Sequence, residues 1–286
     1  MSDYPIAEDI RLVADFFDFS VDDIAEGSGI RATTLFRWLS GESEPSAEYL
    51  SRFYEYAFKR GVPINRIREQ LLREQVESSG GIALFHGAKG TIEWPLSLGK
   101  SRPNNDFGRG FYCGESFEQS AMFVSAFPSS SVYAFAFDPS GLTGLDFHVD
   151  QRWMLAIAWF RGWLGDYAEH PLVIEVREQV EAADYITAPI ADNSMFNTVN
   201  AFIEGEITDI QCQHCLSATN LGRQYVCLSP RALDALEMRQ RCFLPESEKA
   251  SYLETRRQES AVSNGKAKEA KRLFRNEGRY IEEVLS

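Results

Sequence analysis

The sequences LFHGA at residues 84–88 and DFGRGFY at residues 106–112 are the most informative stretches of this chain, and SFEQSAMF at residues 116–123 follows them. The first is an apolar run that ends in a His-Gly step, as a strand often does where it enters a loop. The second is a Gly-x-Gly step that leads into another apolar run, and the third has a helix-like pattern. Together they predict a strand, a glycine-containing turn, a second strand and a helix.

This order of motifs resembles the ADP-ribosyltransferase superfamily, in the branch of diphtheria toxin and poly-ADP-ribose polymerase, and a largely uncharacterised bacterial family within it. The resemblance covers about residues 81–240, and the NAD-binding domain is expected over residues 81–244. It implies an α+β fold with a split two-sheet scaffold that holds NAD in the cleft between its sheets. Such a domain breaks the bond between nicotinamide and ribose.

The resemblance assigns roles to residues around this cleft. His86 would hydrogen-bond a ribose hydroxyl of NAD, and the backbone of Gly87 would pair with the nicotinamide amide, where a side chain would obstruct the approach. Tyr112 and Phe123 would stack on the two faces of the nicotinamide ring, because aromatic rings recognise a planar, electron-poor ring. Each of these residues alone is more often structural, and it is their combination that favours a site.

Three residues in or shortly before the second motif are further candidates for binding NAD. Arg102 and Arg109 flank the loop, and a guanidinium can engage a pyrophosphate through two hydrogen bonds. The alternative for both is an ordinary surface arginine. Gly110 precedes Tyr112 at the spacing of the superfamily. The loop has no phosphate-binding fingerprint of the Walker type.

The third motif of the superfamily is altered in this chain. The superfamily has a glutamate at the head of a late strand, and the corresponding segment, residues 223–228, has Gln224 there. An amide can hold a ribose hydroxyl but cannot act as a base, so Gln224 joins His86 and Tyr112 as a catalytic residue of altered chemistry. Either Gln224 suffices, or another acid replaces the glutamate, or the site binds NAD without turnover. The candidates for a replacing acid are Asp192, Glu204 and Glu206.

The function expected from the resemblance is transfer of a single ADP-ribose from NAD, the co-substrate, to a macromolecule. The expected setting is a bacterial toxin or phage-defence effector, which needs a neutralising partner such as an antitoxin. The acceptor, a protein or a nucleic acid, is left open. One alternative is an NAD glycohydrolase that depletes NAD. Another is a non-enzymatic regulator that senses NAD and binds DNA.

Composition and charge bound the class of protein. The chain has 286 residues, 44% of them hydrophobic, and a formal net charge of −13, which disfavours a chain-wide attraction to nucleic acid or to an anionic membrane. The sequence has no apolar run of transmembrane length and no signal-peptide core at its start, so we expect a cytoplasmic protein with reduced cysteines. Cys212, His214 and Cys215 would supply at most three ligands, and we expect no metal.

Residues 1–77 predict an all-helical module. Apolar residues recur at helical spacing from residue 9 to 75, Ser20 is a predicted N-cap with Asp23 three residues later, and Ser28-Gly29 breaks a helix. The pattern resembles the Xre-like helix-turn-helix family over residues 9–60. Residues 1–76 carry 9 Lys/Arg against 14 Asp/Glu, a net −5 that disfavours DNA and favours dimerisation, partner docking or covering of the NAD cleft. The side chains that could contact DNA are Arg31, Thr33, Thr34 and Arg37.

A Ser-Ser-Gly-Gly junction at residues 78–81 precedes a mixed α+β region. Predicted strands are 82–86, 132–137, 185–190 and 224–228, and predicted helices are 116–126, 151–163, 194–203, 209–218 and 231–239. Residues 245–286 predict a charged helical extension, with helices at 247–258 and 266–284.

Overall fold

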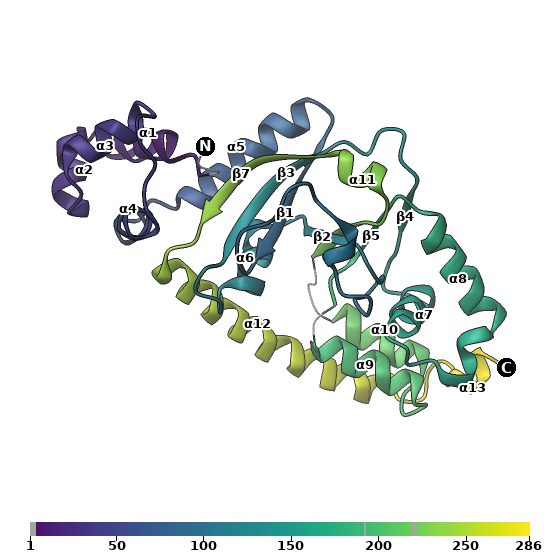
Figure 1. The fold of residues 1–286 in the computed structure, drawn as a ribbon. Helices are drawn as coiled ribbons and strands as arrows, with labels where there is room; N and C mark the ends of the chain where they lie inside the picture. The colour runs from purple at the N-terminus through teal and green to yellow at the C-terminus, as the bar shows by residue number, and fades with distance from the viewer. Residues whose placement is uncertain (1–3, 192, 219–221) are drawn as a thin grey trace. The chain divides into compact units, whose positions relative to one another are not determined.

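The computed structural model describes residues 4–191, 193–218 and 222–286 (Figure 1). The chain forms two compact units, each assembled from three separate segments and each with its own buried core. Unit 1 consists of Met1–Ile92, Ser116–Asp138 and Glu237–Arg256. Unit 2 consists of Glu93–Glu115, Pro139–Leu236 and Arg257–Ser286.

Unit 1 begins with a helical region, as the sequence predicts. The predicted cap is confirmed, because Ser20 Oγ accepts a hydrogen bond from Asp23 N at 3.2 Å while the Asp23 carboxylate accepts one from Ser20 N at 2.8 Å. Gly29 then ends the helix with a left-handed φ of 68°, which glycine adopts without strain. The five helices are α1 (Ile6–Phe17), α2 (Val21–Ser28), α3 (Ala32–Leu39), α4 (Ala47–Lys59) and α5 (Ile64–Ser78).

The rest of unit 1 contains the strands β1 (Ile82–Ala88) and β3 (Ser131–Phe137), which pair antiparallel, and most of β7 (Leu236–Phe243). Helix α6 (Phe117–Val124) packs on β1, where Ser120 Oγ donates a hydrogen bond to Phe85 O at 3.1 Å. Buried apolar residues of α5, α6, β1 and β3 form one core between these elements. The predicted strand at 82–86 and helix at 116–126 are therefore confirmed.

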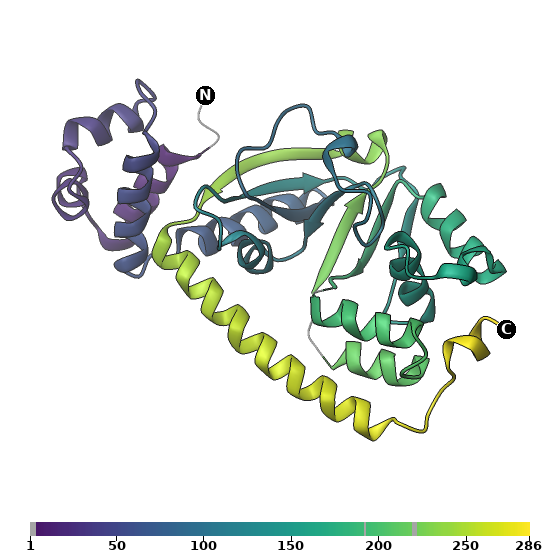
Figure 2. The ribbon, with the colours of Figure 1, turned by 60° about the horizontal axis from the view of Figure 1, so that its bottom comes forward.

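Unit 2 packs helices around a second group of strands. Helices α9 and α10 lie side by side in both views (Figures 1 and 2). The core of the unit is rich in large side chains that are fully buried, among them Phe107, Trp153 and Phe202. The strands are β2 (Phe111–Gly114), β4 (Gly144–Asp146), β5 (Tyr185–Pro189) and β6 (Arg223–Cys227). The helices are α7 (Gln151–Phe160), α8 (Pro171–Ala182), α9 (Asn193–Ile203), α10 (Asp209–Ser217) and α11 (Pro230–Asp234), with short 3-10 turns at Leu98–Lys100 and Gly165–Glu169.

The described strands form one mixed seven-stranded sheet in the order β4-β5-β6-β2-β1-β3-β7. The β4–β5 pair is parallel, and the β1–β3, β2–β6 and β5–β6 pairs are antiparallel. The α+β class is thus confirmed. The split two-sheet scaffold of the ADP-ribosyltransferase superfamily remains a prediction.

The predicted helix at 231–239 is wrong in its second half. Ser229 and Pro230 start α11 as a cap and a first-turn proline, but the helix ends at Asp234, and strand β7 (Leu236–Phe243) follows. Most residues of β7 have high helix propensity, yet they form a strand of the sheet, so pairing with the sheet overrides local preference. Helix α8 was missed by the sequence analysis.

The C-terminal extension is helical, with different boundaries from those predicted. One helix, α12 (Glu246–Leu273), replaces the break expected after residue 258, and a left-handed Gly278 separates it from α13 (Ile281–Val284). Ile281 and Val284 are buried in the core of unit 2, so the end of this tail packs on its own chain. No helix among the described residues is long and apolar enough to cross a membrane.

A buried polar cluster joins α5, β7 and α12 in unit 1. Asn65 Nδ2 donates hydrogen bonds to Phe243 O at 2.8 Å and to Glu248 Oε2 at 2.7 Å, and Tyr252 OH donates to Glu248 Oε1 at 2.9 Å. Burial raises the pKa of the Glu248 carboxyl to about 7, although both hydrogen bonds oppose this shift. Because the folded chain binds this proton more tightly than the unfolded chain, the stabilisation is present at low pH and is lost as the pH rises through about 7.

We predict that Glu248→Gln removes this titration while keeping an acceptor for Asn65. The free energy of unfolding of the variant, relative to wild type, should increase by up to about 3 kcal/mol between pH 5 and pH 8, because ionised Glu248 is the form that burial disfavours. Chemical denaturation of both chains at the two pH values measures this difference. A difference that stays constant, or that changes in the opposite direction, contradicts the assignment.

Candidate functional site

Strands β2, β6 and β5 of unit 2 bring two of the predicted catalytic residues onto one face. Tyr112 pairs with Val226, and Gln224 pairs with Gly114 on one side and with Ala188 on the other. Because side chains alternate along a strand, Tyr112 and Gln224 lie on the same face of the sheet as diagonal neighbours. This face packs on the core of unit 2.

Gln224 is buried, with 7% of its surface exposed, and its amide is held by two acceptors. Its Nε2 donates to Asp106 Oδ2 at 3.2 Å and to Pro189 O at 3.1 Å. A buried amide without partners would be costly, so these bonds fix the position of the side chain. The third motif of the sequence is therefore an ordered part of unit 2.

Asp106 is the acid that contacts Gln224, and it was not predicted from the sequence as a site residue. Its Oδ1 accepts a hydrogen bond from Arg161 Nη2 at 2.9 Å. Burial raises the pKa of the Asp106 carboxyl above its ordinary value, while the bonds from Arg161 and Gln224 act in the opposite direction. The Arg161 guanidinium in turn lies 3.3 Å from the ring centroid of Phe196 and 5.4 Å from that of Trp163. Arg161 and the two aromatic rings around it thus hold Asp106 in position beside Gln224.

Tyr112 ties the motif loop to its strand through the phenol group. The hydroxyl donates to Gly108 O at 2.8 Å and accepts from Phe107 N at 3.1 Å. Burial raises the pKa of this phenol well above its ordinary value, so it is neutral at physiological pH. The ring is half-buried. Tyr112 is therefore suited to stacking and to hydrogen bonding, but not to proton transfer.

The glycines of the motifs have packing roles in the structure. Gly108 adopts a left-handed φ of 70°. A Cβ at Gly110 would lie 2.6 Å from Val226 Cγ1, and a Cβ at Gly87 would lie 2.3 Å from Ser120 O of α6. Close approach of neighbouring elements therefore explains Gly87 and Gly110 before any ligand is considered.

The two arginines of the loop have different surroundings. Arg109 is exposed, but its Nη1 donates to Gly99 O and to Ser101 O, both at 2.9 Å, so part of the guanidinium clamps the chain that precedes the motif. Arg102 is exposed and makes no hydrogen bond or ion pair with the residues the structure describes. Arg102 is thus the more available of the two for a phosphate.

The predicted residues of unit 1 lie on β1 and α6. His86 is half-buried and pairs with Tyr133 of β3. Phe123 is 47% exposed on α6, and the Arg256 guanidinium lies 5.6 Å from its ring centroid. An aromatic ring exposed to this extent has surface left for a ligand.

The structure therefore assembles the candidates as two sets. Unit 1 holds His86, Gly87 and Phe123, and unit 2 holds Arg102, Arg109, Gly110, Tyr112 and Gln224. That both sets line one cavity remains a prediction.

Two of the acids suggested as replacements for the missing glutamate, Glu204 and Glu206, make no hydrogen bond with Gln224. Glu204 is exposed at the end of α9, where it accepts a hydrogen bond from Asn200 at 2.8 Å, and Glu206 is exposed in the following turn. Asp192 lies outside the described residues. Asp106 was missed because 118 residues separate it from Gln224, and no local pattern announces such a contact.

The cysteine and histidine cluster on α10 is packed into the structure. Cys215 Sγ contacts Ala267 O at 3.3 Å, and the His214 ring stacks on Phe274 with centroids 3.5 Å apart. All five cysteines are free and buried. Among the described residues there is no group of three side chains that could hold a metal ion.

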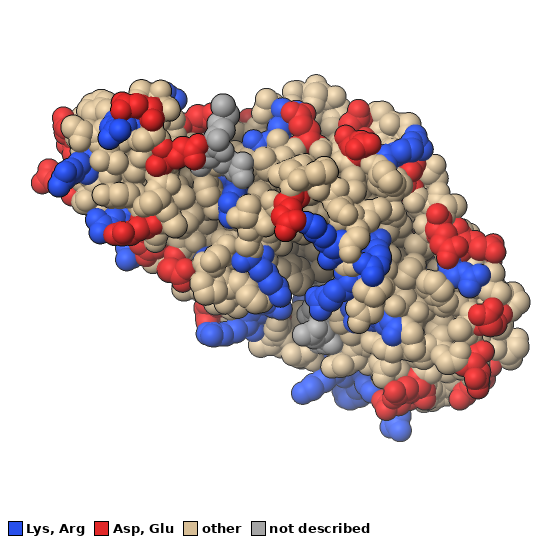
Figure 3. Space-filling view, in the orientation of Figure 1, with Lys and Arg blue, Asp and Glu red and all other residues tan. Residues whose placement is uncertain are grey.

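The helical region presents a mixed surface. Thr33 and Arg37 are exposed on α3, and Arg31 is exposed at its N-cap. Thr34 is half-buried, and Arg37 Nε pairs with Glu42 at 3.0 Å. Acidic and basic side chains are interspersed over the visible face of these helices (Figure 3). Binding to DNA remains a prediction for this region.

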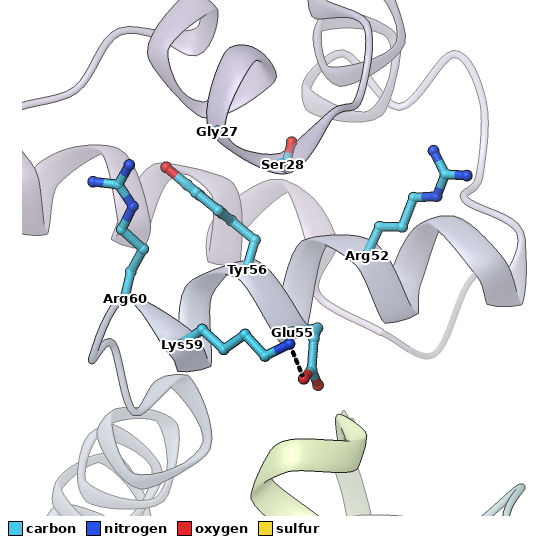
Figure 4. Close-up of a pocket in the computed structure, with 7 residues that line it drawn as sticks. All are labelled: Gly27, Ser28, Arg52, Glu55, Tyr56, Lys59 and Arg60. Carbon is cyan, nitrogen blue, oxygen red and sulfur yellow. Dashed lines mark ion pairs between the residues drawn. The ribbon is translucent and has the colours of Figure 1, made fainter.

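Between α2 and α4 there is a surface hollow of about 480 Å³ (Figure 4). Two of its cations are paired with acids, Lys59 with Glu55 at 3.0 Å and Arg52 with Glu48 at 2.7 Å. This pairing largely neutralises the hollow and weakens any attraction for an anion. Its lining residues are Gly27, Ser28, Arg52, Glu55, Tyr56, Lys59 and Arg60.

We predict that Gly87→Ala destabilises the protein by about 1–3 kcal/mol, because the added methyl group would collide with the Ser120 carbonyl. Gly90→Ala is the matched control, since nothing lies within 4 Å of its Cβ position. Thermal and chemical denaturation of both variants test the packing role. Equal stability of the two variants would show that β1 and α6 do not require glycine here.

The sequence was also compared with known proteins. Residues 82–238 match a family described as "Protein of unknown function (DUF3990)". No curated protein and no solved structure matches the chain. The matched segment extends from β1 to the start of β7 and includes Asp106, Tyr112 and Gln224. Because it covers more than half of the chain, the protein belongs to the DUF3990 family of proteins of unknown function.

Proposed function

We propose that this protein is a mono-ADP-ribosyltransferase, which uses NAD as co-substrate and transfers one ADP-ribose to a macromolecule. The observation that carries the proposal is the register of β2 and β6, which sets Tyr112 and Gln224 on one face at the positions of the second and third motifs. The His86-Gly87 step on β1 and the exposed ring of Phe123 on α6 supply the remaining groups. The proposed scaffold is that of the ADP-ribosyltransferase superfamily.

The reaction divides the work among these side chains. When the nicotinamide–ribose bond breaks, the electron pair leaves with nicotinamide and positive charge develops on the ribose. The rings of Tyr112 and Phe123 would hold the nicotinamide, and His86 and Gln224 would hold ribose hydroxyls. The acceptor then attacks the ribose carbon and loses its proton. Gln224 cannot remove that proton, so we expect the acceptor to be a strong nucleophile or to bring its own base.

The biological setting belongs to the same proposal. A cytoplasmic enzyme that modifies a macromolecule with ADP-ribose would act as a bacterial toxin or phage-defence effector, and an antitoxin or other neutralising protein would be its partner. The helical region would then dock that partner, the acceptor or DNA.

The test is incubation of the full chain with NAD labelled in the adenosine part, in the presence of a bacterial lysate as source of acceptors. Label that stays on protein or nucleic acid after denaturing purification supports transfer. Free ADP-ribose without labelled macromolecule favours an NAD glycohydrolase, and an absence of nicotinamide release at any enzyme concentration favours the non-enzymatic regulator.

His86→Ala should lower nicotinamide release about a hundredfold, because misplacement of the reacting ribose carries a penalty of that order. The matched control is His148→Ala, which removes an imidazole whose side chain is 73% exposed. Circular dichroism and denaturation midpoints confirm that both variants fold. Activity of folded His86→Ala equal to that of the control would remove His86 from the site.

Phe123→Ala should raise the KM for NAD about three- to tenfold with little change in stability, since an aromatic stacking contact contributes about 0.5–1.5 kcal/mol. Phe16→Ala is the control, because Phe16 on α1 is 55% exposed and has no assigned role in the reaction. Initial rates over a range of NAD concentrations separate KM from kcat. An unchanged KM in Phe123→Ala would exclude the second stacking ring.

A further inference from the structure

The surroundings of Gln224 leave only one orientation for its amide. Asp106 Oδ2 lies 3.2 Å and Pro189 O lies 3.1 Å from the same end of the side chain. A backbone carbonyl and an ionised carboxylate accept hydrogen bonds and do not donate them. The end of the amide that faces them must therefore be the NH₂ group, and both of its hydrogens are used.

The other end of the amide is the carbonyl oxygen Oε1. Within the described part of the chain it makes no hydrogen bond, whereas Nε2 makes two. Gln224 can thus only accept a hydrogen bond from a ligand. A free glutamine would offer either end, so this restriction comes from its neighbours.

The Asp106 carboxylate is itself held in place, so the orientation that it imposes on the Gln224 amide is stable. Arg161 holds Oδ1 at 2.9 Å and leaves Oδ2 for Gln224. The Asp106 residue is only 8% exposed, so water competes little for its oxygens. The positive charge of Arg161 also compensates the buried carboxylate, which would otherwise be costly.

We propose that Asp106 is a positioning residue that locks Gln224 as an acceptor-only side chain, so that the group bound at this position is a hydrogen-bond donor such as a ribose hydroxyl. The identity of the ligand rests on the proposed function. The lock, by which we mean the orientation of the Gln224 amide fixed by Asp106 and Pro189, does not depend on it. The locked amide presents an oxygen where the superfamily presents a carboxylate oxygen. It does so without a negative charge.

Because Asp106 fixes Gln224 in this way, the effect of Gln224→Glu can be predicted, although this change would restore the glutamate of the superfamily. The new carboxylate would face the carboxylate of Asp106 and the carbonyl of Pro189, and two carboxylates at this distance repel unless they share a proton. The glutamate should therefore lower both the stability and the activity of the protein. In the double variant Asp106→Asn/Gln224→Glu, the amide of the new asparagine can donate to the new glutamate while its oxygen accepts from Arg161.

The experiment compares wild type, Asp106→Asn, Gln224→Glu and the double variant, with Asp166→Asn as a control at an exposed acid. At pH 8 we expect nicotinamide release by Gln224→Glu to fall at least about tenfold, the effect of a 1.4 kcal/mol penalty, and its melting temperature to fall with it. We expect both quantities to recover in part in the double variant, because the asparagine relieves the repulsion from Asp106 while the Pro189 carbonyl still faces the new carboxylate. Asp106→Asn alone should raise the KM for NAD, because an asparagine NH₂ that faces Gln224 takes away one of the two acceptors that fix the orientation of its amide.

Two measurements, melting temperature and nicotinamide release, distinguish a failure of the lock from a failure of the proposed function. The melting temperatures test the lock whatever the ligand is, so recovery of stability in the double variant supports the lock even in a protein without enzymatic activity. If wild type releases no nicotinamide, the proposed function and the assignment of the ribose are overturned. A Gln224→Glu variant as stable and as active as wild type at pH 8 would overturn the lock. Failure of the double variant to recover any stability would overturn it as well.

Discussion

The hydrogen bonds that Gln224 donates to Asp106 and Pro189 are the constraint on which the candidate site depends. They join β6 to the loop before β2 and to the end of β5, so three separate parts of unit 2 are fixed by one buried amide. A buried polar group of this kind is stabilising only when every partner is in place. The strand register and the position of the motif loop are therefore determined together, and the orientation of the side chain follows from both.

The glycines of the motifs are also constrained by packing and backbone conformation. Gly87 and Gly110 sit where a methyl group would collide with a neighbouring element, and Gly108 adopts a backbone conformation that favours glycine. Each of these residues would be needed for folding even in a chain that bound nothing. A motif that marks a family can thus describe how a loop packs as well as what it binds. For this reason Tyr112 and Gln224 are stronger indications of function than the glycines.

Local patterns predicted local structure well. The capping pair at Ser20, the end of its helix at Gly29 and the strand at 82–86 were all visible in the sequence, because each depends on residues close to one another along the chain. The helix expected at 231–239 was partly wrong because sheet pairing outweighed propensity in β7. Asp106 was missed for a related reason. Its partner is far away in the sequence, and only the folded strands bring the two together.

The most direct test of the account is a titration of the isotope-labelled chain with NAD, followed by NMR at the Gly87 backbone amide and the Gln224 side-chain amide. One residue belongs to each unit, so the two signals report on both sets of candidate residues. The account predicts that both signals shift with the same dissociation constant and that the Gln224 NH₂ group stays protected from exchange with water throughout. A shift at only one of the two positions, or at neither, would contradict the claim that they hold the same dinucleotide.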